Sequence, residues 1–155
     1  MKLTDLLEKN LVLTDLKGQN KKDVLNEFAS LLYEQKKIRD QSEFLEVILA
    51  REALGSTGIG EGIAIPHGRL KNLDRLVLAF GLSLKGIDFD ATDGNPVHIF
   101  FVLVAPDDAP VDHLKSLARI SKILKNRSFR ERLLKAQTRE ELYDQIREED
   151  EKYGP

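Results

Sequence analysis

The sequence predicts an α/β fold in a single domain, with a mixed β-sheet flanked by helices on both faces. Apolar residues recur at helical spacing in the first and last thirds of the 155-residue chain, whereas the middle holds two apolar runs rich in β-formers, 76–84 and 97–104. Neither run alternates cleanly between apolar and polar residues, which is typical of strands covered on both faces. Helices before and after a strand-rich centre therefore favour a sheet between two helical layers.

The first third is predicted to be helical. Asn20 is a candidate N-cap for a first helix. Asp40, with Glu43 three residues later, has the form of a capping box for a second helix, which would carry Arg51 in its last turns. The apolar residues of the first helix recur at helical spacing and are Val24, Leu25, Phe28, Leu31 and Leu32.

Glycines change the character of the centre. Residues 63–65 form a short strand candidate, which Pro66 is expected to end because its ring fixes φ and it lacks an N–H group. Residues 93–96, Asp-Gly-Asn-Pro, predict a turn between the two apolar runs. The glycines that exclude a continuous helix are Gly55, Gly58, Gly60, Gly62 and Gly68.

The last third predicts three further helices. Asp112 is a candidate cap for the first of them, and capping boxes begin at Ser128 and Thr138. Residues 147–155 are highly charged and are expected to form a solvated tail. Without a repeat or linker, residues 1–155 are predicted to be one domain. The predicted apolar stripe of the first helix consists of Leu114, Leu117, Ala118, Ser121 and Leu124.

The composition excludes several classes of function. The longest uncharged apolar run, 97–105, has nine residues, whereas a bilayer span needs about 20. The acidic N-terminus does not resemble a secretion signal, and the lack of cysteine excludes disulfides and thiolate chemistry. The net charge of −2 is spread evenly, so no basic field attracts nucleic acid or membranes. We therefore expect a cytoplasmic protein that neither binds nucleic acid nor inserts into a membrane.

His67 is the leading candidate for chemistry. It follows the 63–65 strand candidate and Pro66 directly, and Gly68 comes next. Pro66 should stop the strand, and Gly68 should let the chain turn away, so that the imidazole is presented at the rim of the sheet. An ordinary histidine in a strand-to-loop turn would have the same pattern.

The segment before His67 predicts an anion-binding loop. Arg51 offers a planar fork of donors that stays charged, and Ser56 and Thr57 supply hydroxyl groups among the glycines. Backbone N–H groups in such loops can line a concavity for an anion. The segment is not a nucleotide P-loop, because no lysine follows the glycines at the required spacing. A flexible loop without a ligand is the alternative.

His113, near the start of a predicted helix, is the candidate partner of His67, since a second imidazole could position the first or bind its phosphate. An exposed residue of the first turn is the alternative. His98 lies within an apolar run and is expected to be structural. The three histidines are spaced unlike any compact metal-ligand motif, so no metal site is predicted.

Residues 51–70, R-E-A-L-G-S-T-G-I-G-E-G-I-A-I-P-H-G-R-L, resemble the phosphorylation-site segment of enzyme IIA domains of the bacterial phosphotransferase system. The matching class is the mannitol/fructose and nitrogen-regulatory class, and the form of the motif is most similar to the nitrogen-regulatory branch. Residues 112–121, D-H-L-K-S-L-A-R-I-S, resemble the segment that carries the second histidine of that family.

The resemblance implies a mixed sheet flanked by helices and a phosphocarrier that needs no cofactor. The phosphorylatable histidine corresponds to His67, the second active-site histidine to His113 and the active-site arginine to Arg51. Ser56 and Thr57 match motif positions near the phosphate, whereas Glu61 fills a variable position and is left out of the site. The family implies attack by Nε2, with Nδ1–H bonded to a backbone carbonyl, and an HPr-type phosphohistidine protein as donor.

Three functions remain open from the sequence. The chain could be a regulatory IIA protein whose phosphorylation state controls binding to target proteins. It could instead pass the phosphoryl group to a sugar-specific IIB domain of the fructose/mannitol type. In a different class, the glycine loop could bind an anionic metabolite without any group transfer.

Overall fold

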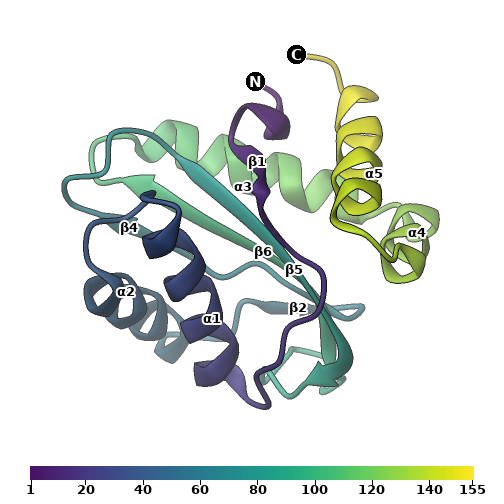
Figure 1. Cartoon of the computed structure of the whole chain (residues 1–155), viewed down its shortest axis with the longest axis horizontal. Helices are drawn as coiled ribbons and strands as arrows, with labels where there is room; N and C mark the ends of the chain where they lie inside the picture. The colour runs from purple at the N-terminus through teal and green to yellow at the C-terminus, as the bar shows by residue number, and fades with distance from the viewer.

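A six-stranded mixed sheet forms the centre of the computed structural model, which describes residues 1–155 (Figure 1). The strand order is β1-β5-β6-β3-β2, and β4 also pairs with β6. β5 and β6 are antiparallel, whereas β1 is parallel to β5, and β3 and β4 are both parallel to β6. The strands are β1 (Leu7–Leu13), β2 (Gly58–Gly60), β3 (Ile63–Ala64), β4 (His67–Leu70), β5 (Val77–Ile87) and β6 (Val97–Pro106).

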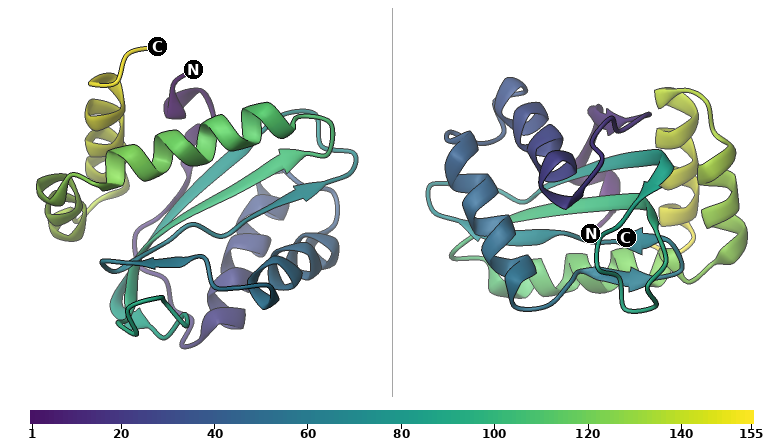
Figure 2. Two further views of the ribbon diagram at one scale, coloured as in Figure 1. Left: turned by 180° about the vertical axis from the view of Figure 1, so that it is seen from behind. Right: turned by 90° about the horizontal axis from the view of Figure 1, so that it is seen from below.

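Five α-helices cover the two faces of this sheet (Figure 2). α1 and α2 lie on one face, and α3 crosses the other; α5 packs against β1, and α4 contacts α3 and α5. None of the helices combines the length and the apolar character that a membrane-spanning segment requires. The helices are α1 (Lys21–Glu34), α2 (Gln41–Ala53), α3 (Pro110–Leu124), α4 (Arg127–Lys135) and α5 (Arg139–Glu151), and a short 3₁₀ helix, η1, spans Leu3–Asp5.

The two central strands are buried from both sides, as their lack of alternation predicted. Every residue of β6 except His98 is buried, and so are the first seven of β5. Aromatic rings fill both faces: Phe80 packs against Phe101 with ring centroids 4.9 Å apart, and Phe89 against Phe100 at 5.4 Å. The predicted α/β class, with one sheet between helical layers, is confirmed.

β3 and β4 continue one another along β6. Ile63 lies opposite Ile99 and His67 opposite Leu103, which is the same register, and between them the carbonyl of Pro66 accepts the N–H of Leu103 at 3.0 Å. The expectation that the chain turns away after Pro66 is therefore wrong. Pro66 removes only its own donor from the ladder, and the strand resumes at His67.

Gly68 also has a different role from the predicted one. It lies within β4, and a Cβ there would stand 2.8 Å from Cγ1 of Val47 in α2. The residue is small because the helix passes close to the strand, not because the chain turns. His67 is consequently fixed to the sheet by the strand on both sides of Pro66.

The first third is only partly helical. Asn20 and Asp40 cap α1 and α2 as predicted, by accepting the N–H groups of Asp23 and Glu43. Residues 7–13, however, form strand β1 at an edge of the sheet. The buried side chains of β1 are separated by charged and polar ones, which explains why its pattern was not recognised.

Two of the three helices of the last third, α3 and α4, begin before their predicted caps. α3 starts at Pro110, a residue suited to the first helical position, so Asp112 lies inside its first turn and is not the cap. Asn126 caps α4 in place of Ser128, while Thr138 caps α5 as predicted. The predicted stripe of α3 was also wrong, since Leu114 is exposed. The buried residues of α3 are His113, Ser116, Ile120, Ile123 and Leu124.

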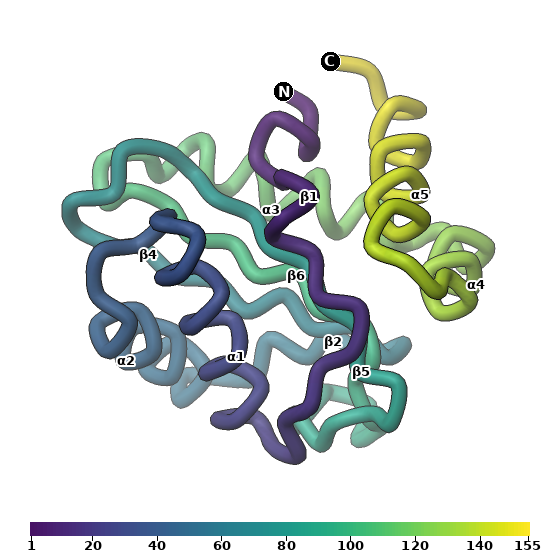
Figure 3. The backbone as a smooth tube through the Cα atoms, in the orientation of Figure 1, coloured from purple at the N-terminus to yellow at the C-terminus, as the bar shows by residue number.

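Residues 147–155 are not a solvated tail. α5 extends to Glu151, and the fully buried Asp150 accepts hydrogen bonds from the N–H of Leu3 at 2.8 Å and from Arg119 Nε at 2.5 Å. The same arginine donates to the carbonyl of Gly154 at 2.6 Å. These bonds hold the two ends of the chain side by side (Figure 3). The two carboxylates that are buried in this segment, those of Glu149 and Asp150, are bound to partners in the chain, whereas Glu148, Glu151 and Lys152 are exposed.

Candidate active site

His67 lies at the edge of the sheet, between α2 on one face and α3 on the other. Its Nδ1 atom is 2.8 Å from the carbonyl oxygen of Ile65. A carbonyl oxygen can only accept, so Nδ1 carries the proton and Nε2 keeps its lone pair. This agrees with the tautomer that the family resemblance implied.

The surroundings of His67 keep its ring neutral. Burial lowers the pKa of His67, and the charge of Arg51 lowers it further, whereas the Ile65 hydrogen bond and the Glu52 carboxylate act in the opposite direction. The net pKa lies below 6.5. A neutral imidazole with a free Nε2 lone pair is a competent nucleophile near pH 7.

His113 stands directly beside His67, as predicted. The two ring centroids are 5.5 Å apart with an interplanar angle of 72°. His113 is 5% exposed, and its Nδ1 lies 3.2 Å from Nε of Arg69. Burial, followed by the charges of His67 and Arg69, lowers the pKa of His113 to about 4. Its Nε2 atom is buried and has no hydrogen-bond partner.

Arg51 completes the cluster from the last turn of α2. Its guanidinium donates to the carbonyl of Gly55 at 2.8 Å. Arg51, His67, Arg69 and His113 all line one cleft of about 520 Å³, whose floor and sides also include Val47, Ala50, Leu54 and Gly68. Two imidazoles and two guanidinium groups on one cleft, with no carboxylate among its lining residues, form a suitable environment for a phosphoryl group.

Ser56 and Thr57 do not line this cleft. The Ser56 hydroxyl donates to the carbonyl of Phe89 at 2.6 Å and accepts the N–H of Gly58 at 3.0 Å. The Thr57 side chain binds the buried carboxylate of Glu52, which also accepts the N–H of Thr57. In this arrangement the two hydroxyls hold the loop to its neighbours, and their contact with phosphate stays a prediction.

The residues left out of the site lie elsewhere, as expected. His98 is bonded through Nδ1 to the carbonyl of Ser83 at 2.8 Å and packs against Gly86, so its role is structural. Glu61 is exposed, and its carboxylate lies 3.7 Å from Arg130. No three His, Asp or Glu side chains in the chain gather as a metal site would require.

A family model described as "Phosphoenolpyruvate-dependent sugar phosphotransferase system, EIIA 2" matches residues 5–149. The chain belongs to this family. Its members include the phosphoryl-carrying IIA components of the phosphotransferase system, and the present chain is accordingly a IIA-type phosphocarrier of that system.

Two kinds of curated relative resemble this IIA chain. It is 39% identical to a nitrogen regulatory protein of Escherichia coli, with 94% of this chain and 90% of that protein covered, and 38% identical to one of Bradyrhizobium diazoefficiens, with 92% and 93% covered. It is also 37% identical to the fructose-specific EIIABC component of Bacillus subtilis. The match includes 97% of this chain but only 24% of that longer protein.

Solved structures agree with the fold. The nitrogen regulatory protein IIA-Ntr of Neisseria meningitidis superposes with a TM-score of 0.87 at 33% identity, covering 93% of this chain and 98% of that one. IIA mannitol of Escherichia coli superposes with a TM-score of 0.77 at 20% identity, covering 90% and 97%, and supports the fold alone.

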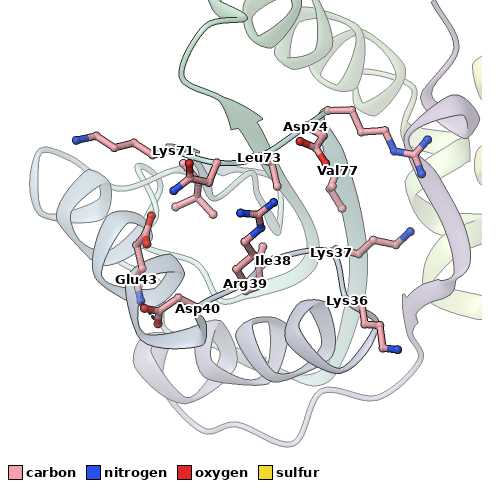
Figure 4. A pocket seen from close by; sticks show the side chains of 13 residues that line it. Lys36, Lys37, Ile38, Arg39, Asp40, Glu43, Lys71, Leu73, Asp74 and Val77 are labelled. Carbon is pink, nitrogen blue, oxygen red and sulfur yellow. Dashed lines mark hydrogen bonds between the residues drawn. The ribbon is translucent and has the colours of Figure 1, made fainter.

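A second hollow in the IIA domain is separate from the histidine cleft. It measures about 350 Å³ and lies beyond the C-terminal end of β4, between the α1–α2 and β4–β5 loops (Figure 4). Arg39 points into it, and the lining also includes Lys71 and Arg75. Three carboxylates, from Asp40, Glu43 and Asp74, share this lining. Lys36 and Lys37 also line the hollow, so five basic side chains stand against three carboxylates, and no histidine is present.

Sequence reasoning missed two residues of the IIA site, Arg69 and Glu52. Arg69 lies two residues after His67 in β4, so both side chains leave the strand on the same side. The spacing of two residues could therefore have identified Arg69, but only if residues 67–70 had been predicted as a strand. Glu52 is buried at the end of α2, where it binds Thr57 and, at 3.1 Å, Nζ of Lys21. Nothing in its sequence neighbourhood distinguishes it from a solvated helical glutamate.

Proposed function

We propose that this IIA protein accepts a phosphoryl group on Nε2 of His67 from a phosphohistidine of an HPr-type carrier, and that it acts as a nitrogen-regulatory signalling protein. One observation carries the assignment of the acceptor. The Ile65 carbonyl holds Nδ1–H of His67 and leaves the Nε2 lone pair free, in a cleft shared with Arg51 and His113.

The transfer needs no change in the number of protons on His67. Its Nε2 lone pair attacks phosphorus while the bond from phosphorus to the donor imidazole breaks, and the donor nitrogen recovers that electron pair. The proton of His67 stays on Nδ1, bonded to Ile65. Phosphorylated imidazole replaces phosphorylated imidazole, so the step is readily reversible, as a relay or a reporter requires.

Arg51 and His113 would stabilise the charge of the transferring group. Phosphoryl transfer passes through a loose transition state with charge spread over three equatorial oxygens, and catalysis consists of positioning and electrostatic stabilisation. Arg51 would supply charged donors from one side of the cleft. His113 would supply its buried Nε2–H, which has no partner within the chain. No metal, nucleotide or other cofactor enters this step.

An exposed apolar rim supports a protein as donor. Leu54, which lines the cleft, is 85% exposed, and Val111 and Leu114 flank His113 on α3 with their side chains largely exposed. Large exposed apolar side chains around a reactive group are typical of a protein docking surface. A small free phosphoryl donor would not need them.

Sequence identity and the form of the motif support regulation over sugar transport. Nitrogen regulatory proteins of Bradyrhizobium diazoefficiens and Escherichia coli are 38% and 39% identical to this chain, whereas the fructose-like EIIA component of Escherichia coli is 27% identical. Sugar transport through a IIB domain is the second candidate, because a related mannitol IIA protein of Escherichia coli has been solved as a complex with phosphorylated IIB. Target proteins of a regulatory IIA would be the alternative partners. A cytoplasmic location fits these partners and the absence of cysteine.

Intact-mass measurement tests the proposal. The purified chain is incubated with phosphoenolpyruvate, enzyme I and HPr-type carriers, and we expect it to gain the mass of one phosphoryl group, which acid should remove. His67→Gln should take no label, whereas the matched variant His98→Gln should label like wild type. An unmodified wild type would favour the anion-binding module, and full labelling of His67→Gln would refute the acceptor.

A further inference from the structure

We propose that Arg69 is a positioning residue for phosphoryl transfer, whose Nε–H holds His113 in the tautomer that presents Nε2–H to a phosphoryl group on His67. The inference rests on the proposed function of His67. It adds a residue that acts through a second side chain, not through the phosphate.

The direction of the hydrogen bond between Arg69 and His113 is fixed by chemistry. Nε of Arg69 lies 3.2 Å from Nδ1 of His113. A guanidinium group is protonated at any working pH and has no acceptor, so it can only donate. Nδ1 of His113 must therefore offer its lone pair. In the neutral ring the proton then resides on Nε2.

The resulting donor, Nε2–H of His113, is not used within the chain. Nε2 of His113 is buried and has no partner in the chain. An unpaired buried donor is unfavourable, so its presence in a native structure needs an explanation, and a catalytic role is one of those known. The ring stands at 72° to that of His67, with the centroids 5.5 Å apart. A phosphoryl oxygen on Nε2 of His67 would be such an acceptor.

The opposite tautomer would oppose transfer. With the proton on Nδ1, the Nε2 lone pair of His113 would face the oxygens of the incoming group, which carry negative charge. Burial is the main cause that lowers the pKa of His113 to about 4, and the interactions with His67 and Arg69 act in the same direction, so His113 does not become protonated on both nitrogens near neutral pH. Nε2 of His113 therefore acts as a donor only in the neutral tautomer that carries its proton on Nε2.

The strand provides the geometry for Arg69. β4 pairs His67 with Leu103 and Arg69 with Ala105 in one uninterrupted parallel ladder. Residues two apart in a strand project on the same side. His67, which receives the phosphoryl group, and Arg69, which orients His113, thus lie on the same strand.

Three variants test this inference on the full chain. Arg69→Glu should invert the tautomer, because a carboxylate accepts the proton of Nδ1 where the guanidinium donated one. Arg69→Lys keeps a charged donor at this position and should preserve the wild-type tautomer of His113. Arg75→Glu is the matched control, since Arg75 follows β4 on the exposed loop, has no ion pair and does not line the histidine cleft.

Nitrogen-15 NMR of the imidazoles in the unphosphorylated protein reports the tautomer directly. We expect wild type, Arg69→Lys and Arg75→Glu to show His113 protonated on Nε2, and Arg69→Glu to show it protonated on Nδ1. Labelling at saturating phosphorylated carrier should be about a hundredfold slower in Arg69→Glu, the order of effect of removing one preorganised donor. The rates of Arg69→Lys and Arg75→Glu should stay near that of wild type.

The two readouts separate this inference from the proposed function. A labelled wild type combined with an unchanged His113 tautomer in Arg69→Glu would overturn the inference about Arg69 alone. Equal slowing in Arg69→Glu and Arg75→Glu would also overturn it, because charge alone would then explain the loss. Absence of label in the wild type would overturn the proposed function and the transfer role of Arg69 together, whatever the NMR pattern.

Discussion

Gly68 lies so close to Val47 that a Cβ at position 68 would stand 2.8 Å from its Cγ1 atom, and 3.1 Å from Cδ1 of Ile48. Val47 and Arg51 belong to α2, whereas Gly68 follows His67 in β4. The missing side chain thereby lets the helix that carries the arginine approach the strand that carries the histidine. The separation between the two groups depends on this contact.

Gly68→Ala should therefore destabilise the fold and slow transfer. Overpacking typically costs about 1–3 kcal/mol, and relief of the clash would push α2, with Arg51, away from His67. Urea unfolding and the rate of labelling measure the two effects. Adding Val47→Ala creates room, so the double variant should recover part of both losses. Strictly additive effects of the two substitutions would contradict the proposed contact.

Thr57→Val distinguishes two roles for the Thr57 hydroxyl. The hydroxyl binds the buried carboxylate of Glu52, and its loss leaves that carboxylate short of a partner. We expect a loss of about 1–3 kcal/mol in the free energy of unfolding, with slower transfer as a secondary effect of a looser loop. Unchanged stability with strongly slowed transfer would favour direct phosphate binding instead. Glu61→Gln, in the same loop but exposed, is the control.

His113 should make stability depend on pH. Its pKa is about 4 in the folded protein, whereas an unfolded histidine has a pKa near 6.5. Because the unfolded chain binds the proton more tightly, this stabilising contribution is complete above pH 6.5 and is lost as pH falls through 4. It amounts to about 3 kcal/mol. The difference in unfolding free energy between wild type and His113→Gln should change by that order between pH 7 and 4, and a constant difference would contradict it.

The buried Asp150 should be essential for stability. Asp150→Asn removes the charge that pairs with Arg119, whose side chain is itself largely buried. Breaking one partner of such a pair typically costs about 3–5 kcal/mol. Glu151→Gln, its neighbour in the same helix, removes a more exposed pair with Arg147 and should have a much smaller effect. Thermal unfolding compares the two variants. Equal losses of stability would contradict the structural role of Asp150 and favour a solvated tail at residues 147–155.

The central sheet and the caps of α1, α2 and α5 could be predicted because their causes are local. A buried strand needs apolar residues on both faces, and an N-cap needs an oxygen beside free N–H groups. β1 escaped prediction because an edge strand with one polar side lacks such a run. The face of α3 escaped it because Leu114 is apolar yet exposed, while the polar His113 is buried.

Within the site, His67 and Arg51 were identified from the long motif at residues 51–70, and His113 from the shorter segment at residues 112–121. The direction of the chain at Gly68 did not, because it depends on how near α2 passes. Arg69 acts through a contact with a side chain 44 residues away, and Glu52 acts through Lys21 and Thr57. Contacts of this kind are set by tertiary packing, and no local spacing in the sequence encodes them.

The first and last residues of the chain lie close together, so the order of the elements along the chain could be changed by circular permutation. Ser116 of α3 contacts Met1, and Arg119, one turn further, holds Gly154. A short glycine-rich peptide could therefore link the last residue to the first, and new ends could be opened in the exposed turn at 93–96, without disturbing the strand that carries His67. A circularly permuted phosphocarrier built in this way would keep its native cleft, while its chain would begin and end in the turn between β5 and β6, at the other end of the molecule from the present termini (Figure 1).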